Sequence, residues 1–241
     1  MSKEFNGNDY KPKPTWDERR QNFKSKFTEF KNYLKDKWVN HKKQILINYL
    51  IFTILFIILL AIDQITKGAL FKWADFANYK GDKTVIYEGA IIGVRSVEHY
   101  GVTVLPWENK ATIIIIQILS IIMFLALLTV PFFTESKTIV VMMALLCAGS
   151  IGNMLDRFMW AGHVKDIFFC TFLEKWQGKE IGTFNFADVV LVGGCIGLLI
   201  YFVVSLIAEY VSEEKEKNNA SLTADADQDN KNSDTDDLNE K

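Results

Sequence analysis

Carboxylates stand at or close to the ends of the apolar stretches of this sequence. They are Asp63, Asp156, Asp166 and Asp188. A charged side chain close to membrane lipid is costly, so a carboxylate in such a place is a functional candidate by default. Two carboxylates that share one proton can hydrolyse a peptide bond without a metal, a serine triad or a thiol. One takes a proton from the attacking water while the other donates a proton to the carbonyl oxygen.

The spacing of the carboxylates does not decide which two would form such a pair. Asp188 is one obvious partner, and the other is Asp156 or Asp166. Like charges held close together cannot both ionise easily, so the pair would titrate as one unit. A partly dry site at the mouth of a membrane span would strengthen this coupling.

Further polar side chains have helical spacing that brings them next to these carboxylates. The pairs are Asp63 with Lys67, Asn153 with Arg157, and Asn185 with Asp188. Residues three or four apart share one helix face. For the first pair two interpretations stay open: a supporting part of the site, or an ion pair that only fixes the depth of a span. Gly149 and Gly152 allow another backbone to approach the third apolar stretch closely.

The apolar stretches are long enough to be membrane spans. A hydrocarbon core of roughly 30 Å requires about 20 helical residues. The runs are Ile45–Ile62, Ala111–Phe133, Thr138–Leu155 and Val189–Ala208. Four such runs in 241 residues argue against buried helices of a soluble domain. We therefore expect an all-α membrane protein whose spans cover about 45–66, 111–133, 138–157 and 186–208.

The charge distribution divides the chain into a basic arm (1–44), a four-span domain (45–208) and an acidic tail (209–241). The arm has twelve Lys and Arg against six Asp and Glu, whereas the tail has eleven acidic residues and four Lys. The first apolar run begins too late and is too long for a cleavable signal peptide, so we expect it to remain as an anchor. Positive charge beside this span predicts a cytoplasmic N-terminus, and four spans return the C-terminus to the cytoplasm. The tail has too few apolar residues to fold and is expected to be disordered.

The arm contains a predicted amphipathic helix. Thr15 and Glu18 have the spacing of a capping box at its start. Phe23, Phe27, Phe30, Leu34 and Trp38 then follow at steps of four, three, four and four, which places them along one stripe. A basic helix with an aromatic stripe is typical of a helix that lies on anionic lipid. The alternative is a solvated helix that touches another part of the protein.

This orientation places the three polar clusters near Asp63, Asn153–Arg157 and Asn185–Asp188 at the outer membrane face, as one site. Between spans one and two, β-branched runs at 84–87, 90–97 and 102–105 predict a small antiparallel sheet that rests on the bilayer outside the cytoplasm. Tryptophans flank the spans on this side as an aromatic belt would. They are Trp73, Trp107, Trp160 and Trp176.

Cysteine and histidine residues are few and have no metal-ligand spacing. The cysteines are Cys147, Cys170 and Cys195, and the histidines are His41, His99 and His163. They form neither CxxC nor HExxH patterns, so the sequence predicts no disulfide framework, no metal site and no cofactor.

Four segments occur in the order found in lipoprotein signal peptidases, also called signal peptidase II. They are Asp63–Lys67 (DQxxK), Gly152–Arg157 (GNxxDR), Val164–Phe168 (similar to VxDF) and Phe184–Asp188 (FNxAD). Each motif is weak alone, but four in order with four spans are a strong signal. The chain resembles this family over roughly residues 45–208, with the arm and the tail outside the match.

The resemblance implies roles for the polar residues. The catalytic pair would be Asp166 and Asp188, with Asp156 as the alternative to Asp166. Asp156 would otherwise be structural and bond the loop that carries Asp166. The remaining residues would position the substrate (Asn153, Arg157 and Asn185) or support the site (Asp63 and Lys67).

The sequence departs from the family pattern near two of these segments. The family's outer loop has an Asn-x-Gly-Ala-Ala-Phe-like motif, whereas this chain has His99-Tyr100-Gly101-Val102-Thr103-Val104. Only Gly101 fits clearly, and we assign no binding role to His99 from the sequence. Lys165 and Ile167 around Asp166 also differ from the commoner pattern, and the connection from Asp166 to Asp188 is slightly long.

The activity that the resemblance implies is that of an aspartic endopeptidase in a bacterial cell (inner, cytoplasmic) membrane. It would cleave lipid-modified prolipoproteins before the diacylglyceryl-cysteine. Its partners would be these substrates and membrane lipid, without nucleic acid, and we expect a monomer. A proton- or ion-coupled transporter is the alternative, but it predicts charges near mid-membrane and repeated halves. A membrane scaffold with capped spans would leave Asp166 and Asp188 without a role.

Overall fold

The computed structural model describes residues 14–100 and 110–236, with side chains up to residue 217. Two compact units divide the chain, residues 1–48 and residues 49–241. Helix α1 (Trp16–Leu70) begins in the first unit and continues into the second. The backbone of His41 departs from helical angles (φ −121°, ψ 17°), so two helices join at this residue.

The start of α1 confirms the predicted capping box. The backbone N–H of Thr15 donates to Glu18 Oε2 at 2.7 Å, and the N–H of Glu18 donates to Thr15 Oγ1 at 3.4 Å. These reciprocal bonds satisfy two N–H groups that the first turn of a helix leaves free. The arm is therefore helical from Trp16, as the sequence predicts.

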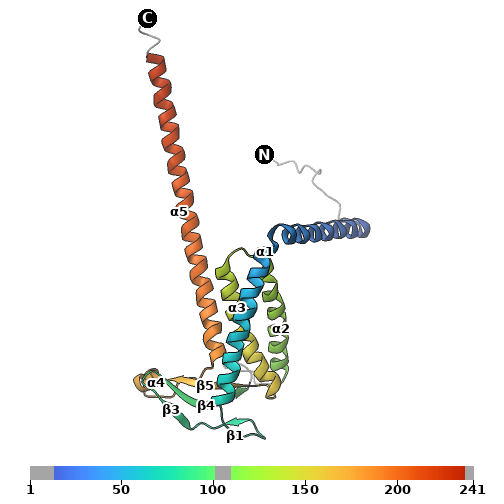
Figure 1. Cartoon of the computed structure of the whole chain (residues 1–241), viewed down its shortest axis with the longest axis vertical. Coiled ribbons are helices and arrows are strands. Elements are labelled where there is room, and N and C mark those ends of the chain that lie inside the picture. Colours follow the sequence, from blue (N-terminus) through green and yellow to red (C-terminus); the bar gives the residue numbers. More distant parts are fainter. Residues whose placement is uncertain (1–13, 101–109, 237–241) are drawn as a thin grey trace, which may run out of the picture. The chain divides into compact units, whose positions relative to one another are not determined.

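The second unit contains the predicted spans as long helices (Figure 1). They are the later part of α1, α2 (Lys110–Phe133), α3 (Lys137–Met159) and α5 (Phe186–Asp236). In the described part of the chain, these are the four helices long and apolar enough to cross a membrane. Ser136 caps α3 by accepting a hydrogen bond from the N–H of Ile139 at 3.4 Å.

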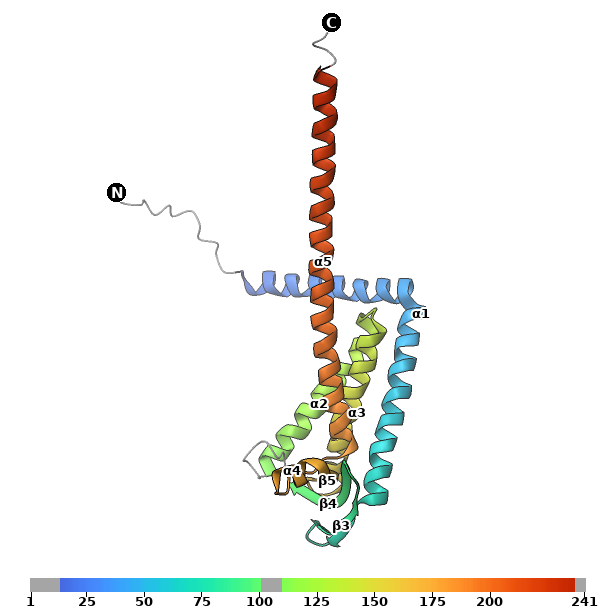
Figure 2. The ribbon, with the colours of Figure 1, turned by 90° about the vertical axis from the view of Figure 1, so that its left-hand side faces the viewer.

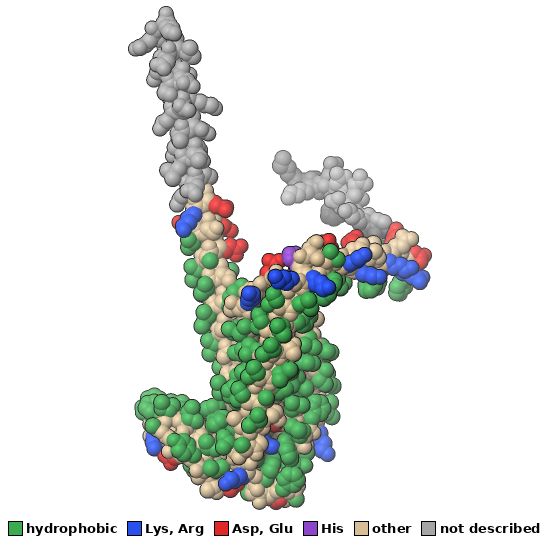
Figure 3. Space-filling model, in the orientation of Figure 1, with side chains coloured by type: hydrophobic (Ala, Val, Ile, Leu, Met, Phe, Trp, Pro, Cys, Tyr) green, Lys and Arg blue, Asp and Glu red, His purple; other side chains and the backbone are tan. Residues whose placement is uncertain are grey.

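The helices of this unit pack around α3 (Figures 1 and 2). Phe52 of α1 is buried in a cluster with Val140, Ala144, Cys147 and Ile151 of α3. Side chains of α2 also pack against this cluster. Most other apolar side chains on these helices are exposed and cover the surface seen in Figure 3, as expected for helices that face lipid.

Short strands lie at the end of the helices where α1 finishes and α5 begins (Figure 2). Strands β1 (Trp73–Asp75) and β2 (Lys80–Gly81) form an antiparallel pair. A second, three-stranded antiparallel sheet has the order β3–β4–β5. Its strands are β3 (Val85–Glu88), β4 (Ile92–Tyr100) and β5 (His163–Cys170).

The three-stranded sheet is larger than the sequence predicts. We expected its strands only between spans one and two, but β5 comes from the connection between spans three and four and pairs with β4. Alternation of apolar residues reveals a strand locally but does not identify a partner some seventy residues away. Helix α4 (Thr171–Gln177) follows β5 directly. The strand expected at 102–105, and Trp107, lie outside the described residues.

Helix α5 continues past the expected end of the fourth span to Asp236, and the disorder of the acidic tail stays a prediction. No proline or glycine interrupts residues 209–236, so nothing in this sequence forces the helix of the fourth span to end. Side chains from 202 to 217 are exposed throughout. The described part of the tail is thus a helix continued from the span, with no buried face of its own up to residue 217.

Candidate active site

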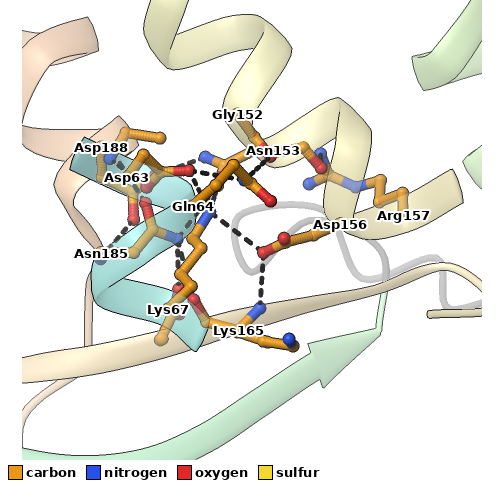
Figure 4. Close-up of polar contacts among 12 residues, drawn as sticks. Asp63, Gln64, Lys67, Gly152, Asn153, Asp156, Arg157, Lys165, Asn185 and Asp188 are labelled. Carbon is orange, nitrogen blue, oxygen red and sulfur yellow. Dashed lines mark hydrogen bonds and ion pairs between the residues drawn. The ribbon is translucent and has the colours of Figure 1, made fainter. Parts of the chain in front are cut away.

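Four separate segments bring their polar side chains together at the strand end of the helices (Figure 4). They are the last turns of α1 and α3, strand β5 and the first turn of α5. The residues that meet are Asp63, Lys67, Asn153, Asp156, Arg157, Lys165, Asp166, Asn185 and Asp188. The polar clusters that the sequence predicts to form one site therefore do lie together.

A cavity of about 510 Å³ opens beside part of this cluster. Asp166 and Asp188 both line it, together with Asn153 and Arg157. The other lining residues are His99, Ser120, Gly149, Ser150, Thr183, Phe184 and Leu191. A cavity of this size, with convergent polar and charged side chains on its wall, can hold a ligand or a short stretch of substrate.

Asn185 joins the two cavity-lining carboxylates. Its side-chain Nδ2 donates to Asp166 Oδ1 at 2.8 Å, and its backbone N–H donates to Asp188 Oδ2 at 3.0 Å. The N–H of Asp188 donates in return to Asn185 Oδ1 at 3.0 Å. These reciprocal bonds form a cap at the start of α5. The same cap therefore positions both carboxylates.

Asn153 on α3 holds the other side of Asp188. Its Nδ2 donates to Asp188 Oδ1 at 2.7 Å, while its Oδ1 accepts from Lys67 Nζ and from Asn185 Nδ2, both at 3.0 Å. This pattern fixes the orientation of the amide. Arg157, one turn later, donates from Nη1 to the Asn153 carbonyl at 3.1 Å and brings a cation to the cavity wall.

A buried ion cluster lies behind the cavity. Lys67 Nζ is 2.9 Å from Asp63 Oδ2 and 3.0 Å from Asp156 Oδ2, and all three side chains are almost fully buried. Asp63 Oδ1 also accepts from the N–H of Ala187 at 2.8 Å. The cluster thus links α1, α3 and α5, which is more than an isolated pair at a span end would do. This arrangement is what we expect if Asp63 and Lys67 support the site and do not only fix the depth of a span.

Asp156 and Asp166 occupy different positions relative to the cavity. Asp156 is fully buried, and its Oδ2 accepts from the N–H of Lys165 at 3.1 Å (Figure 4). Asp166 lines the cavity with 4% of its surface exposed, whereas Asp156 is not among the lining residues. Of the two candidate partners of Asp188, Asp166 is therefore the one that shares the cavity with it. Asp156 holds the strand that carries Asp166.

The environment of Asp166 favours its protonated form. Burial raises the pKa of the Asp166 carboxyl above its ordinary value. Hydrogen bonding and charge from His99 and the bond from Asn185 lower this pKa, and the nearby charge of Asp188 raises it, so that the net direction is upward. A carboxyl in this state can donate a proton at a pH where an exposed aspartate cannot.

His99 lines the site, although we assigned it no role from the sequence. Its Nδ1 lies 2.9 Å from Asp166 Oδ2, and it lines the cavity. The pairing of β4 with β5 brings the two together, since Val97 is opposite Asp166 and His99 is opposite Val164. One feature of the sequence could have indicated this role: His99 stands where the motif of the family has an asparagine.

In the described part of the chain, no three His, Cys, Asp or Glu side chains are grouped as metal ligands.

Comparison with known proteins identifies the family. Residues 55–204 match the family described as signal peptidase (SPase) II. The chain belongs to the signal peptidase II family. Lipoprotein signal peptidases of Xanthomonas campestris pv. campestris (strain 8004) and Xanthomonas oryzae pv. oryzae (strain PXO99A) are each 41% identical to it over 59 residues. Each match covers 24% of this chain and about a third (32%) of the relative's length.

Solved structures agree with this fold. Two structures described as a bacterial membrane enzyme align with TM-scores of 0.52 and 0.51, both at 22% identity. The first alignment covers 64% of this chain and 88% of the other, and the second covers 63% and 91%. At this identity the similarity shows a shared fold. The protein is thus a membrane protein with the fold of a bacterial membrane enzyme.

Proposed function

We propose that this signal peptidase II family member is a membrane-embedded aspartic endopeptidase. It removes signal peptides from lipid-modified prolipoproteins by cleavage before the diacylglyceryl-cysteine. The observation that carries the proposal is that Asp166 and Asp188 line one cavity and are joined through Asn185. The family match and the names of the relatives support the substrate class.

The two carboxyl groups have complementary parts in this reaction. Asp188 accepts a proton from water as the water oxygen attacks the scissile carbonyl carbon. Asp166, whose pKa is raised by burial, begins protonated and donates its proton to the carbonyl oxygen. Collapse of the resulting tetrahedral gem-diol breaks the C–N bond. The proton held by Asp188 goes to the leaving amine, and one hydroxyl of the diol returns a proton to Asp166 as the new carboxyl group forms.

The neighbouring side chains position these groups and the substrate. Asn153 and Asn185 hold the carboxylates through the bonds described above. Arg157 presents its guanidinium to the cavity, where it is placed to bind a substrate carbonyl. His99 Nδ1 lies within hydrogen-bond distance of Asp166 Oδ2, so the imidazole is placed to orient that carboxyl in the cavity.

The spans and the charge of the arm support a location of the site at the outer membrane face. The cavity lies at the end of the spans where α1 finishes and α5 begins, and the first span separates it along the chain from the basic arm. With the N- and C-termini in the cytoplasm, the site opens at the outer face of a bacterial cell membrane. A substrate cysteine anchored by diacylglycerol would reach this depth without leaving the lipid.

The direct test is cleavage by purified protein in detergent or lipid nanodiscs. The substrates are a prolipoprotein with its diacylglyceryl-cysteine and the same polypeptide without the lipid. We expect the lipid-modified form to be cut before the cysteine, as mass spectrometry of the two products would show. A well-folded protein that cuts neither form, or cuts elsewhere, contradicts the proposal. Proton or ion flux in proteoliposomes without any cleavage would instead support the transporter.

A further inference from the structure

The first helical part of α1, residues 16–40, exposes a continuous aromatic stripe. The exposed fractions of its rings range from 86% at Trp16 to 40% at Trp38, and Phe23, Phe27 and Phe30 lie between these values. Phe23 and Phe27 stack with ring centroids 6.4 Å apart. Aromatic side chains along one stripe form a larger apolar patch than a surface in water usually keeps uncovered.

Most charges on this helix are sorted by sign around the stripe; the exceptions are Asp17, which falls on a flank, and Arg20, which falls at the edge of the stripe in line with Trp38. At 3.6 residues per turn, cationic residues fall on both flanks of the stripe and three acidic residues fall on the opposite face. The flanking residues are Arg19, Lys24, Lys26, Lys31, Lys35 and Lys37, and the opposite residues are Glu18, Glu29 and Asp36. Figure 3 shows this arrangement on the visible side of the helix, with apolar, basic and acidic side chains in separate bands.

We propose that residues 16–40 form a binding surface for anionic phospholipid. The aromatic rings would enter the boundary between headgroups and acyl chains, while the flanking cations contact lipid phosphates and the acidic face stays in water. Lys37 Nζ lies 6.0 Å from the ring centroid of Tyr33, so its stem already follows the aromatic surface. This helix lies outside the family match, which begins at residue 55.

The acidic tail is the other charge-complementary candidate within the chain. It has acidic residues in plenty but almost no apolar side chains after Val211. It would neutralise the cations but leave the aromatic rings exposed. A membrane surface satisfies both the apolar stripe and the cationic flanks, and we therefore assign the surface to lipid.

The test uses the full chain with benzoyl-phenylalanine at position 30 or at position 32. Two residues of helix turn the side chain by about 200°, so Phe30 lies in the stripe and Asn32 lies opposite. Each variant is reconstituted in nanodiscs of phosphatidylcholine alone or of equal phosphatidylcholine and phosphatidylglycerol. After irradiation, mass spectrometry of the tryptic arm peptides distinguishes lipid adducts from protein crosslinks.

We expect phosphatidylglycerol adducts from position 30 and almost none from position 32. A Lys24→Gln/Lys31→Gln/Lys35→Gln variant should lose these adducts by about tenfold or more, because each cation near an anionic surface contributes binding. Equal adducts at both positions, or none at either, would overturn the proposal. Crosslinks from position 30 to residues of the tail or of a second copy would also overturn it, in favour of a protein contact.

Discussion

At the scale of single residues, the decisive property is the protonation of Asp166. Its carboxyl is 4% exposed and bonded by Asn185 and His99. Burial raises the pKa of this carboxyl, which favours its protonated form and suits it to the part of proton donor that we propose. Asp188 is more exposed and is bonded by two amide groups. The different surroundings of two identical side chains are consistent with the different parts that we propose for them.

This difference predicts a pH dependence of both activity and stability. Because the folded-state pKa of Asp166 is raised above the unfolded value, its contribution to folding stability is fully present below the unfolded pKa. It is lost as pH rises through the folded pKa. Cleavage should fall over the same upper range as the donor proton is lost. The unfolding temperature measured against pH tests whether stability falls as pH rises. Asp166→Asn is the control, because its side chain does not titrate. A wild-type stability that rises with pH where the variant's is flat would contradict this prediction.

Replacement of His99 tests whether it positions Asp166. His99→Ala removes a hydrogen bond to the charged form of Asp166, so the pKa of that carboxyl should rise further. The upper limb of the pH–rate profile should therefore move to higher pH. A bond to a charged group is worth about 1.5–3 kcal/mol, so kcat should fall roughly 10- to 100-fold. His99→Asn keeps a donor near the Nδ1 position and should recover part of the rate. An unchanged profile with only reduced folded protein would indicate a structural role.

At the scale of secondary-structure elements, the buried ion cluster joins the helices that carry the site. Lys67→Met would leave Asp63 and Asp156 buried without their cation, and removal of one partner of such a cluster costs about 3–5 kcal/mol. Lys175→Met is the matched control, because Lys175 and Glu88 form an exposed pair worth at most about 1 kcal/mol. Thermal unfolding in detergent should separate the two variants clearly. Equal, small shifts would show that the cluster contributes little.

The close approach of α1, α3 and α5 depends on Gly152. A Cβ at this position would lie 2.6 Å from Asp63 Oδ2 and 3.0 Å from the Cβ of Ala187, and Asp63 is held by its own bonds. Gly152→Ala should therefore destabilise the protein by about 1–3 kcal/mol and reduce cleavage. Gly193→Ala is the control in α5, where the nearest heavy atom would be at 4.0 Å. If both variants retain wild-type stability and activity, the proposed close packing is wrong.

At the scale of the whole molecule, the sequence predicts what depends on local pattern. The four spans follow from apolar runs, and the capping box of Thr15 and Glu18 follows from spacing. The pairing of β5 with β4 was not predictable in this way, because register between distant strands leaves no local signal. For the same reason His99 received no role, although the strand pairing brings it to Asp166. Motif order predicted the residues that gather at the site, but not which of them line the cavity.

Cleavage of a lipid-modified prolipoprotein by three variants beside the wild type decides whether Asp166 and Asp188 form the catalytic pair. The variants are Asp166→Asn, Asp188→Asn and Asp156→Asn, each checked for folding by thermal unfolding. We expect the first two to be folded and to fall to background, because each removes one carboxyl of the pair. Asp156→Asn should be less stable but retain measurable cleavage. An active Asp166→Asn beside a folded, inactive Asp156→Asn would contradict the assignment of the catalytic pair.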